Sequence, residues 1–244
     1  MKRVYIDMDG VLCKYHEEFL KMVQLNPKIQ YPQTQYGFYV SLPEVEGAIE
    51  AYLELEKYYD VWILTRPSWQ NPLCYSEKRV WVEQHLSKEH CKKLILCYDK
   101  SLLKGDYLID DNSYDFEGQS ILFKSKDFPD WKTVLDVLVP SKLQEWSGYI
   151  TKVRGNEIDV RLKDLTSGGT EEETTFDLKK DIKLEYKHLI EEGACFTWSI
   201  GENKLKDGVS SINFMLPFTK EEMEKMQTQA KEYADKMIQD LKWI

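Results

Sequence analysis

Five short apolar segments alternate with helix-like segments in the first half of the chain, and this alternation restricts the fold more than any other feature. Nearly continuous apolar runs are typical of strands that are covered on both faces of a parallel sheet. Strands followed by helices in this way predict right-handed crossovers and a doubly wound α/β fold, with ligands at the carboxyl ends of the strands. The candidate strands are RVYID (3–7), VWILT (61–65), KLILC (93–97), DYLID (106–110) and SILF (120–123), and the candidate helices are EVEGAIEAYLELEKY (44–58), SEKRVWVEQHLS (76–87, with Ser76 as N-cap) and DWKTVLDVL (130–138).

Near Val139–Pro140 the pattern changes to that of a small antiparallel β-domain. GYITKVRGNEIDVRLKDL (148–165) alternates apolar and polar residues, and Gly155–Asn156 within it suits a hairpin turn. Three more strand-like runs follow, TFDL (175–178), ACFTWSIG (194–201) and SSINFMLP (210–217). We predict one domain over 1–138 and a second, β-rich domain over 139–244, for which a barrel is one arrangement.

A final helix is predicted over 219–242, with Thr219 and Glu222 spaced as a capping box. Its apolar residues recur at steps of three and four. This stripe fits packing against one of the domains, and it also fits the seam of a coiled-coil dimer. An oligomer formed through this helix is therefore one of two alternatives.

Composition and charge restrict the partners and the compartment. The formal net charge of -9 disfavours broad binding to nucleic acid, which requires a basic surface. No apolar run approaches the ~20 residues of a membrane span, and the strand-like N-terminus lacks the apolar stretch of a signal peptide. The five cysteines are odd in number and scattered, so we interpret them as free thiols in a reducing compartment. We expect a cytoplasmic protein that does not bind membranes.

Functional groups stand where the predicted strands end. Asp7 and Asp9 follow the first strand with one residue between them, so both carboxylates face the same way and require a cation or a proton between them. The same sheet edge would also carry Thr65, Lys100, Asp110 and Asp111. Clustered carboxylates favour Mg²⁺, and a hydroxyl and an ammonium beside it suit the oxygens of a phosphoryl group. Taken singly, each of these groups also fits a turn, a cap or a solvated side chain.

The motifs DMDGVL (7–12), ILTRP (63–67), DKS (99–101) and GDYLIDDN (105–112) resemble those of the haloacid-dehalogenase-like phosphohydrolases. Within this superfamily, residues 1–138 are most similar to the 5'(3')-deoxyribonucleotidases. The resemblance implies that Asp7 is the nucleophile and that Asp9 is the acid and base, with its backbone carbonyl on the metal. It further implies that Thr65 and Lys100 hold the phosphoryl group, that Asp111 binds Mg²⁺, and that Asp110 is a ligand or the partner of a ligand.

Two features depart from that family. Arg66 stands where the nucleotidases have a hydroxyl residue; it could clamp a phosphate or a carboxylate of the substrate, or pair with a surface acid. The cap that follows the first motif, over 14–42, is also shorter than the family's helical cap. Its aromatic side chains could stack on a base or pack the cap against the core. We expect Tyr36 and Phe38, which flank Gly37, to contact a substrate.

These observations predict a Mg²⁺-dependent phosphomonoesterase, similar to 5'-nucleotidases, that acts through an aspartyl-phosphate on nucleoside monophosphates or similar small phosphates. Two alternatives remain open for the β-domain. It could bind nucleic acid and make the protein a polynucleotide end phosphatase, which the acidic charge disfavours. It could also make the protein a regulatory or binding protein.

Overall fold

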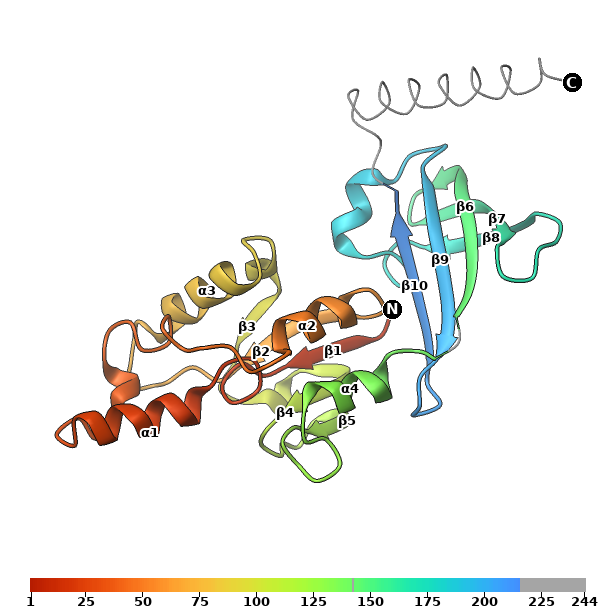
Figure 1. Ribbon diagram of the computed structural model, residues 1–244. Coiled ribbons are helices and arrows are strands. Elements are labelled where there is room, and N and C mark those ends of the chain that lie inside the picture. Colours follow the sequence, from red (N-terminus) through yellow and green to blue (C-terminus); the bar gives the residue numbers. More distant parts are fainter. Residues whose placement is uncertain (142, 216–244) are drawn as a thin grey trace, which may run out of the picture.

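The computed structural model describes residues 1–141 and 143–215, and it contains two separate sheets (Figure 1). The first is a five-stranded parallel sheet in the order β3-β2-β1-β4-β5. Val4 in the central strand pairs with Val61 on one side and with Tyr107 on the other. The predicted parallel sheet is therefore confirmed. Its strands are β1 (Arg3–Ile6), β2 (Asp60–Thr65), β3 (Leu94–Leu96), β4 (Lys104–Asp110) and β5 (Glu117–Leu122).

The helices near this sheet match the predicted helices, except at some of their ends and in the cap. Helix α3 begins at Cys74, so Ser76 lies inside the helix and is not its N-cap. Asp130 does cap α4, because its Oδ1 accepts from the Thr133 backbone N–H at 2.8 Å. The cap contains a helix, α1, that the sequence analysis did not predict. The bounds are α1 (Tyr15–Leu25), α2 (Ala48–Glu56), α3 (Cys74–His85) and α4 (Trp131–Leu138), with short 3₁₀ helices η1 (Pro32–Thr34), η2 (His90–Lys93) and η3 (Lys100–Leu102).

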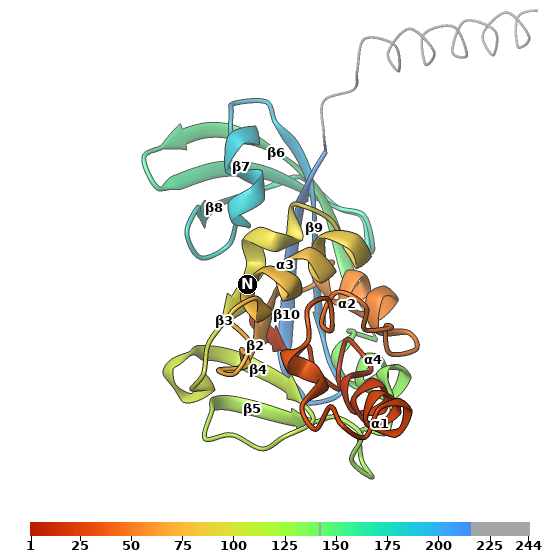
Figure 2. The ribbon, with the colours of Figure 1, turned by 90° about the vertical axis from the view of Figure 1, so that its left-hand side faces the viewer.

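The α-helices pack on only one face of the parallel sheet (Figure 2). Alternate strand residues, such as Val4 and Ile6, belong to the core that α2, α3 and α4 cover. The opposite face carries Tyr5 and Leu64, which pack instead against the non-helical crossovers 97–103 and 111–116. In the described part of the chain the sheet is therefore not wound by helices on both faces. That part of the doubly wound prediction is wrong, because both crossovers on this face are too short to form an α-helix.

The second sheet is antiparallel, with five strands in the order β10-β9-β6-β7-β8. Arg154 pairs with Glu157, and Gly155 has a φ of +60°, so the predicted two-residue hairpin turn is confirmed. The order is that of an open sheet, not of a closed barrel, over the described strands. The helix predicted over 219–242 lies outside the described residues. The elements here are β6 (Leu143–Arg154), β7 (Glu157–Asp164), β8 (Glu172–Asp177), η4 (Leu184–Leu189), β9 (Cys195–Glu202) and β10 (Gly208–Phe214).

The tip of the β9–β10 hairpin connects the two sheets. Asn203 is buried there, and its side-chain amide donates to the hydroxyls of Tyr59, at 3.2 Å, and Tyr107, at 3.0 Å. Val209 joins the core of the parallel sheet. Tyr59 directly precedes β2, so this contact lies toward the amino ends of the parallel strands and leaves their carboxyl ends open to other groups.

Candidate active site

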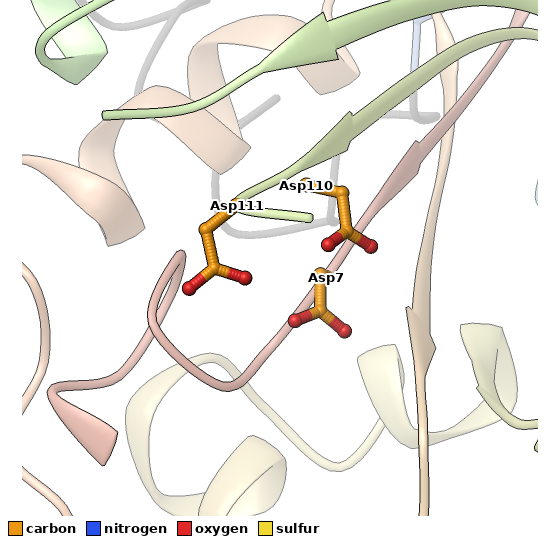
Figure 3. A group of neighbouring side chains, drawn as sticks. All are labelled: Asp7, Asp110 and Asp111. Carbon is orange, nitrogen blue, oxygen red and sulfur yellow. The ribbon is translucent and has the colours of Figure 1, made fainter. Parts of the chain in front are cut away.

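Three aspartates converge at the carboxyl edge of the parallel sheet (Figure 3). Asp7 directly follows β1, Asp110 ends β4, and Asp111 comes next in the chain. The backbone N–H of Asp7 donates to the carbonyl of Ile109 at 2.9 Å, which fixes the end of β1 beside β4. Carboxylate oxygens of the three residues lie within 4.8 Å of one another. Neighbouring parallel strands thus bring together groups that are about a hundred residues apart in the sequence.

Lys100 lies among these carboxylates. Its ammonium is buried and is 2.5 Å from both Asp7 Oδ1 and Asp110 Oδ2. Burial lowers the pKa of Lys100, but the charges of Asp7 and Asp110 outweigh burial and raise it. Asp99 accepts from the Ser101 backbone N–H at 3.0 Å and so caps the short helix η3 that begins with Lys100. The lysine is therefore held as a charged group inside the cluster.

Asp110 and Asp111 are costly to ionise in this position. Burial and the nearby charge of Asp7 raise the pKa of Asp110 to about 7, against the effect of Lys100. Burial, and again Asp7, also raise the pKa of Asp111, whose Oδ2 lies 3.2 Å from His16 Nε2. One ammonium does not compensate for this many carboxylates. The cluster therefore favours a further positive charge.

Gly10 provides the space for Asp111. It has a φ of +83°, and a Cβ at this position would lie 2.1 Å from Asp111 Oδ2. Both the backbone conformation and the close approach exclude a larger side chain. The glycine of the DMDG motif thus allows the loop after β1 to pass directly beside the third aspartate.

Asp9 and Thr65 are joined by a lysine that the sequence analysis missed. Lys78 is completely buried on α3, and its ammonium donates to Asp9 Oδ2 and to Thr65 Oγ1, both at 2.7 Å. It also donates to the carbonyl of Arg66 at 3.0 Å. Burial raises the pKa of the Asp9 carboxyl group, and the charge of Lys78 opposes that rise. The site therefore contains two buried ammonium groups, one on each side of the loop that starts at Asp7.

The sequence did hold a signal for Lys78. Cys74, Lys78 and Trp81 recur at steps of four and three, which places the lysine on the apolar face of α3. Glu77 is also buried, and it accepts from the backbone N–H of Gly37 at 2.9 Å and of Tyr39 at 3.0 Å. A charged residue on the buried face of a helix requires a partner. Lys78 finds its partners in the active site, and Glu77 finds its partners in the backbone of the cap.

The three predicted substrate-binding residues have different surroundings. The Arg66 guanidinium lies 3.9 Å from the centre of the Tyr98 ring, and no carboxylate pairs with it among the described residues. The Tyr36 side chain is 86% exposed. Phe38 is 2% exposed and packs edge-on against Tyr15 and Tyr39, as the packing alternative expected. Contact with a substrate remains a prediction for all three, and Phe38 has little free surface for it.

The donor set fits a divalent metal ion. Asp7, Asp110 and Asp111 offer oxygen atoms alone, which hard cations prefer. The side chain of Asp9 is not part of this group, because it is turned toward Lys78. The cluster could thus hold a metal with three carboxylates, and a cation there would oppose the burial that raises the pKa of Asp110 and Asp111.

A parallel sheet with this carboxylate edge, a threonine at the end of the neighbouring strand and a buried lysine defines a phosphohydrolase of the haloacid-dehalogenase-like class. The comparison with protein families agrees: the family described as "5' nucleotidase, deoxy (Pyrimidine), cytosolic type C protein" matches residues 17–134. The chain belongs to this 5'(3')-deoxyribonucleotidase family of phosphoric monoester hydrolases. The match ends before the antiparallel sheet begins.

Similar proteins come from a phage and from animals. A Vibrio phage KVP40 protein named "Putative 5'(3')-deoxyribonucleotidase" is 38% identical over 143 residues, which are 55% of this chain and 83% of the phage protein. The human "5'(3')-deoxyribonucleotidase, cytosolic type" is 30% identical over 164 residues, covering 54% of this chain and 78% of the human protein. The mouse "5'(3')-deoxyribonucleotidase, mitochondrial" is 28% identical over 164 residues, covering 54% of this chain and 71% of the mouse protein.

Proposed function

We propose that the protein hydrolyses nucleoside monophosphates, or similar small phosphate monoesters, with Mg²⁺ and through an aspartyl-phosphate on Asp7. The observation that carries this proposal is the position of Asp7. It is held between the Lys100 ammonium and two further carboxylates at the carboxyl edge of the sheet. A carboxylate placed there can attack phosphorus, and the surrounding groups can neutralise the charge of the phosphoryl oxygens.

The reaction proceeds in two steps on this chain's own residues. An Asp7 oxygen forms a bond to phosphorus while the ester P–O bond breaks, and Asp9 gives a proton to the leaving oxygen. Water then attacks the phosphorus, the bond to Asp7 breaks, phosphate leaves, and Asp9 takes up the proton of the water. The raised pKa of Asp9 supports this role, because a higher pKa makes a carboxylate a better acceptor of the proton of water. Thr65 and Lys100 would hold the phosphoryl oxygens, and Lys78 would hold Asp9 and Thr65 in position.

Magnesium would be held by Asp7, Asp110 and Asp111, together with the backbone carbonyl of Asp9. When bound, it would supply the positive charge that allows a phosphate dianion to approach this many carboxylates. The donor set supports this assignment, since Mg²⁺ is normally bound by carboxylates and water.

The family indicates a nucleotide as substrate, and the cap indicates weak discrimination among nucleotides. Tyr36 projects into solvent and Phe38 is buried, so the short cap offers few groups to hold a base. Sites without buried polar partners for a substrate discriminate weakly. We expect several nucleotides and other monophosphates to be hydrolysed with kcat/KM values within about two orders of magnitude.

A panel of phosphate esters tests the function. It contains 5'- and 3'-deoxynucleotides, ribonucleotides, sugar phosphates and a 5'-phosphorylated single-stranded oligonucleotide, each with Mg²⁺ and with a chelator. We expect release of phosphate from small monophosphates that depends on Mg²⁺. Hydrolysis that persists in chelator would refute the metal assignment. A preference for the oligonucleotide, or for one deoxynucleotide by more than about a thousandfold, would refute weak discrimination by a short cap.

We further propose that the protein works in a reducing cytoplasm. All five cysteines are free thiols, and Cys13 and Cys74 are buried. Among the helices in 1–141 and 143–215, none has the length and apolar character that crossing a membrane requires.

A further inference from the structure

A cavity lies at the amino ends of the parallel strands, away from the carboxyl edge that holds the three aspartates. Its volume is about 830 Å³. The parallel sheet contributes Arg3 at the start of β1, and Asp60 and Trp62 in β2. The segment 179–188, between β8 and the end of η4, contributes the other wall. The parallel sheet and the segment 179–188 therefore form this cavity together.

The cavity exists because one face of the parallel sheet has no helix. Trp62 lies on that face with Tyr5 and Leu64, and the segment 179–188 stands across from it. The indole N–H of Trp62 is buried and has no hydrogen-bond partner among the described residues. A buried donor without a partner is costly, and a bound acceptor or water would relieve that cost.

The lining is basic although the whole chain carries a net charge of -9. Seven lysine and arginine side chains face four carboxylates around the cavity. The carboxylates are already paired: Asp60 with Arg3 at 2.9 Å, Glu89 with Lys92 at 2.5 Å, and Glu185 with Lys93 at 3.4 Å. The fourth, Glu56, accepts from His90 Nε2 at 3.0 Å.

Positive charge is left over on the wall formed by the antiparallel unit. The ammonium groups of Lys179, Lys180 and Lys187 are not within salt-bridge distance of any carboxylate in the described part of the chain. Lys183 is buried, donates to the carbonyl of Glu56 at 2.5 Å and lies 3.9 Å from the Glu185 carboxylate, and burial lowers its pKa despite that carboxylate. A negative charge in the cavity would stabilise the ionised form of Lys183 and screen the three exposed lysines from one another.

We propose that this cavity is a second binding site, for a small anion that carries several phosphate groups. Its volume is in the range of small-molecule sites, and its basic wall and single indole suit a chain of phosphates with or without a nucleoside. Such a ligand would contact the parallel sheet and the segment 179–188 at once. The site is separate from the one that we propose for hydrolysis and does not depend on it.

Titration calorimetry on the full-length protein tests the site, with inorganic tripolyphosphate and with dATP as probes. A chelator is present, because uncompensated carboxylates at the active site then repel anions. We expect one molecule bound per chain, more tightly at low salt. The variant Lys180→Glu/Lys187→Glu should bind at least about tenfold more weakly, because charge-assisted contacts are replaced by repulsion. The matched control Lys126→Glu/Lys132→Glu changes the net charge equally at exposed positions outside the cavity.

The outcomes separate this site from the hydrolytic one. The variant Lys180→Glu/Lys187→Glu should hydrolyse p-nitrophenyl phosphate like the parent. Weaker binding of the probes together with unchanged turnover would therefore support the proposal. Equal affinities for both probes would assign the ligand to the phosphate chain alone, and tighter dATP binding would assign a nucleotide. Absence of binding, equal weakening in the control, or binding of a single-stranded oligonucleotide in place of both probes would overturn the proposal.

Discussion

Two buried aspartates, one in each sheet, have pKa values that are shifted in opposite directions. Asp110 ends β4 and is 2% exposed, and its surroundings raise its pKa to about 7. Asp164 ends β7 and is 7% exposed, yet its surroundings lower its pKa to about 2. Both residues end a strand and both are largely shielded from water. Burial is the largest cause of the raised pKa of Asp110, whereas at Asp164 hydrogen bonds outweigh burial and lower the pKa.

The partners of the two carboxylates also differ. Asp164 accepts only from neutral donors, among them the backbone N–H groups of Thr166, at 2.7 Å, and Ser167, at 3.1 Å, and the Gln144 side chain, at 3.0 Å. Asp110 shares Lys100 with Asp7 and lies beside another carboxylate. A carboxylate that a turn satisfies completely has a structural role. One that is left short of positive charge fits the cation site that we propose.

The largest effect should follow from Asp7→Asn, which changes the chemistry at the carboxyl edge and little else. The amide is nearly isosteric but a poor nucleophile, so we expect kcat to fall by about 10⁴-fold or more. The thermal midpoint should change little. Phosphate release and a thermal melt measure the two effects, and turnover within tenfold of the parent would remove Asp7 from the role of nucleophile.

The next effect concerns Lys78. In Lys78→Met, Asp9 and Thr65 lose their shared donor, so both become free to move from the position that the phosphoryl group requires. We expect kcat/KM to fall by about 10²-fold or more. Arg79→Met is the matched control, since Arg79 neighbours Lys78 on α3 but is exposed and pairs with Glu83. A similar loss in both variants would mean that helix stability, not the active site, depends on Lys78.

How far the sequence predicts the site depends on how local each signal is. Asp7, Thr65 and Asp110 each end or directly follow an apolar strand, so parallel topology alone brings them to one edge. Lys78 was missed because the spacing of Cys74, Lys78 and Trp81 places it on a buried helix face but does not identify the groups that it contacts. The face of the sheet without helices was missed because a strand pattern predicts that a residue is buried, but it does not predict whether a helix or a loop covers that residue. Short crossovers such as 111–116 were the available signal.

Truncation after Leu138 tests the domain boundary that we propose at Val139–Pro140. The shorter chain keeps every predicted catalytic residue but loses Asn203 and Val209 from its amino edge. We expect it to fold with a lower thermal midpoint and to retain measurable phosphatase activity. Circular dichroism and the phosphatase assay test this. An aggregated or inert product would mean that the antiparallel unit completes the fold of the first, and the boundary would be wrong.

A smaller change, Asn203→Ala, breaks the same contact without removing the second sheet. It leaves the buried hydroxyls of Tyr59 and Tyr107 with one donor fewer, which costs about 1–3 kcal/mol of unfolding free energy. Activity should be unchanged, because the contact lies at the amino ends of the strands. Denaturant unfolding measures the loss. The exposed Asn26→Ala serves as control and should stay within about 0.5 kcal/mol of the parent.

The smallest expected effect is a difference between Asp164 and Asp110 in how stability depends on pH. Because the pKa of Asp164 is depressed in the folded state, its stabilising contribution is present above the unfolded value of about 3.9 and is lost as the pH falls through about 2. Asp110 has a raised pKa, so without a metal its ionisation costs stability as the pH rises toward about 7. The difference in stability between the parent and Asp164→Asn should therefore be constant from pH 7 to pH 5 and shrink between pH 4 and pH 2. Urea unfolding of both proteins in chelator across this range measures it. A difference that stays constant down to pH 2 would show that the turn after β7 does not depend on the charge of Asp164. The structural role assigned to Asp164, in contrast to Asp110, would then be wrong.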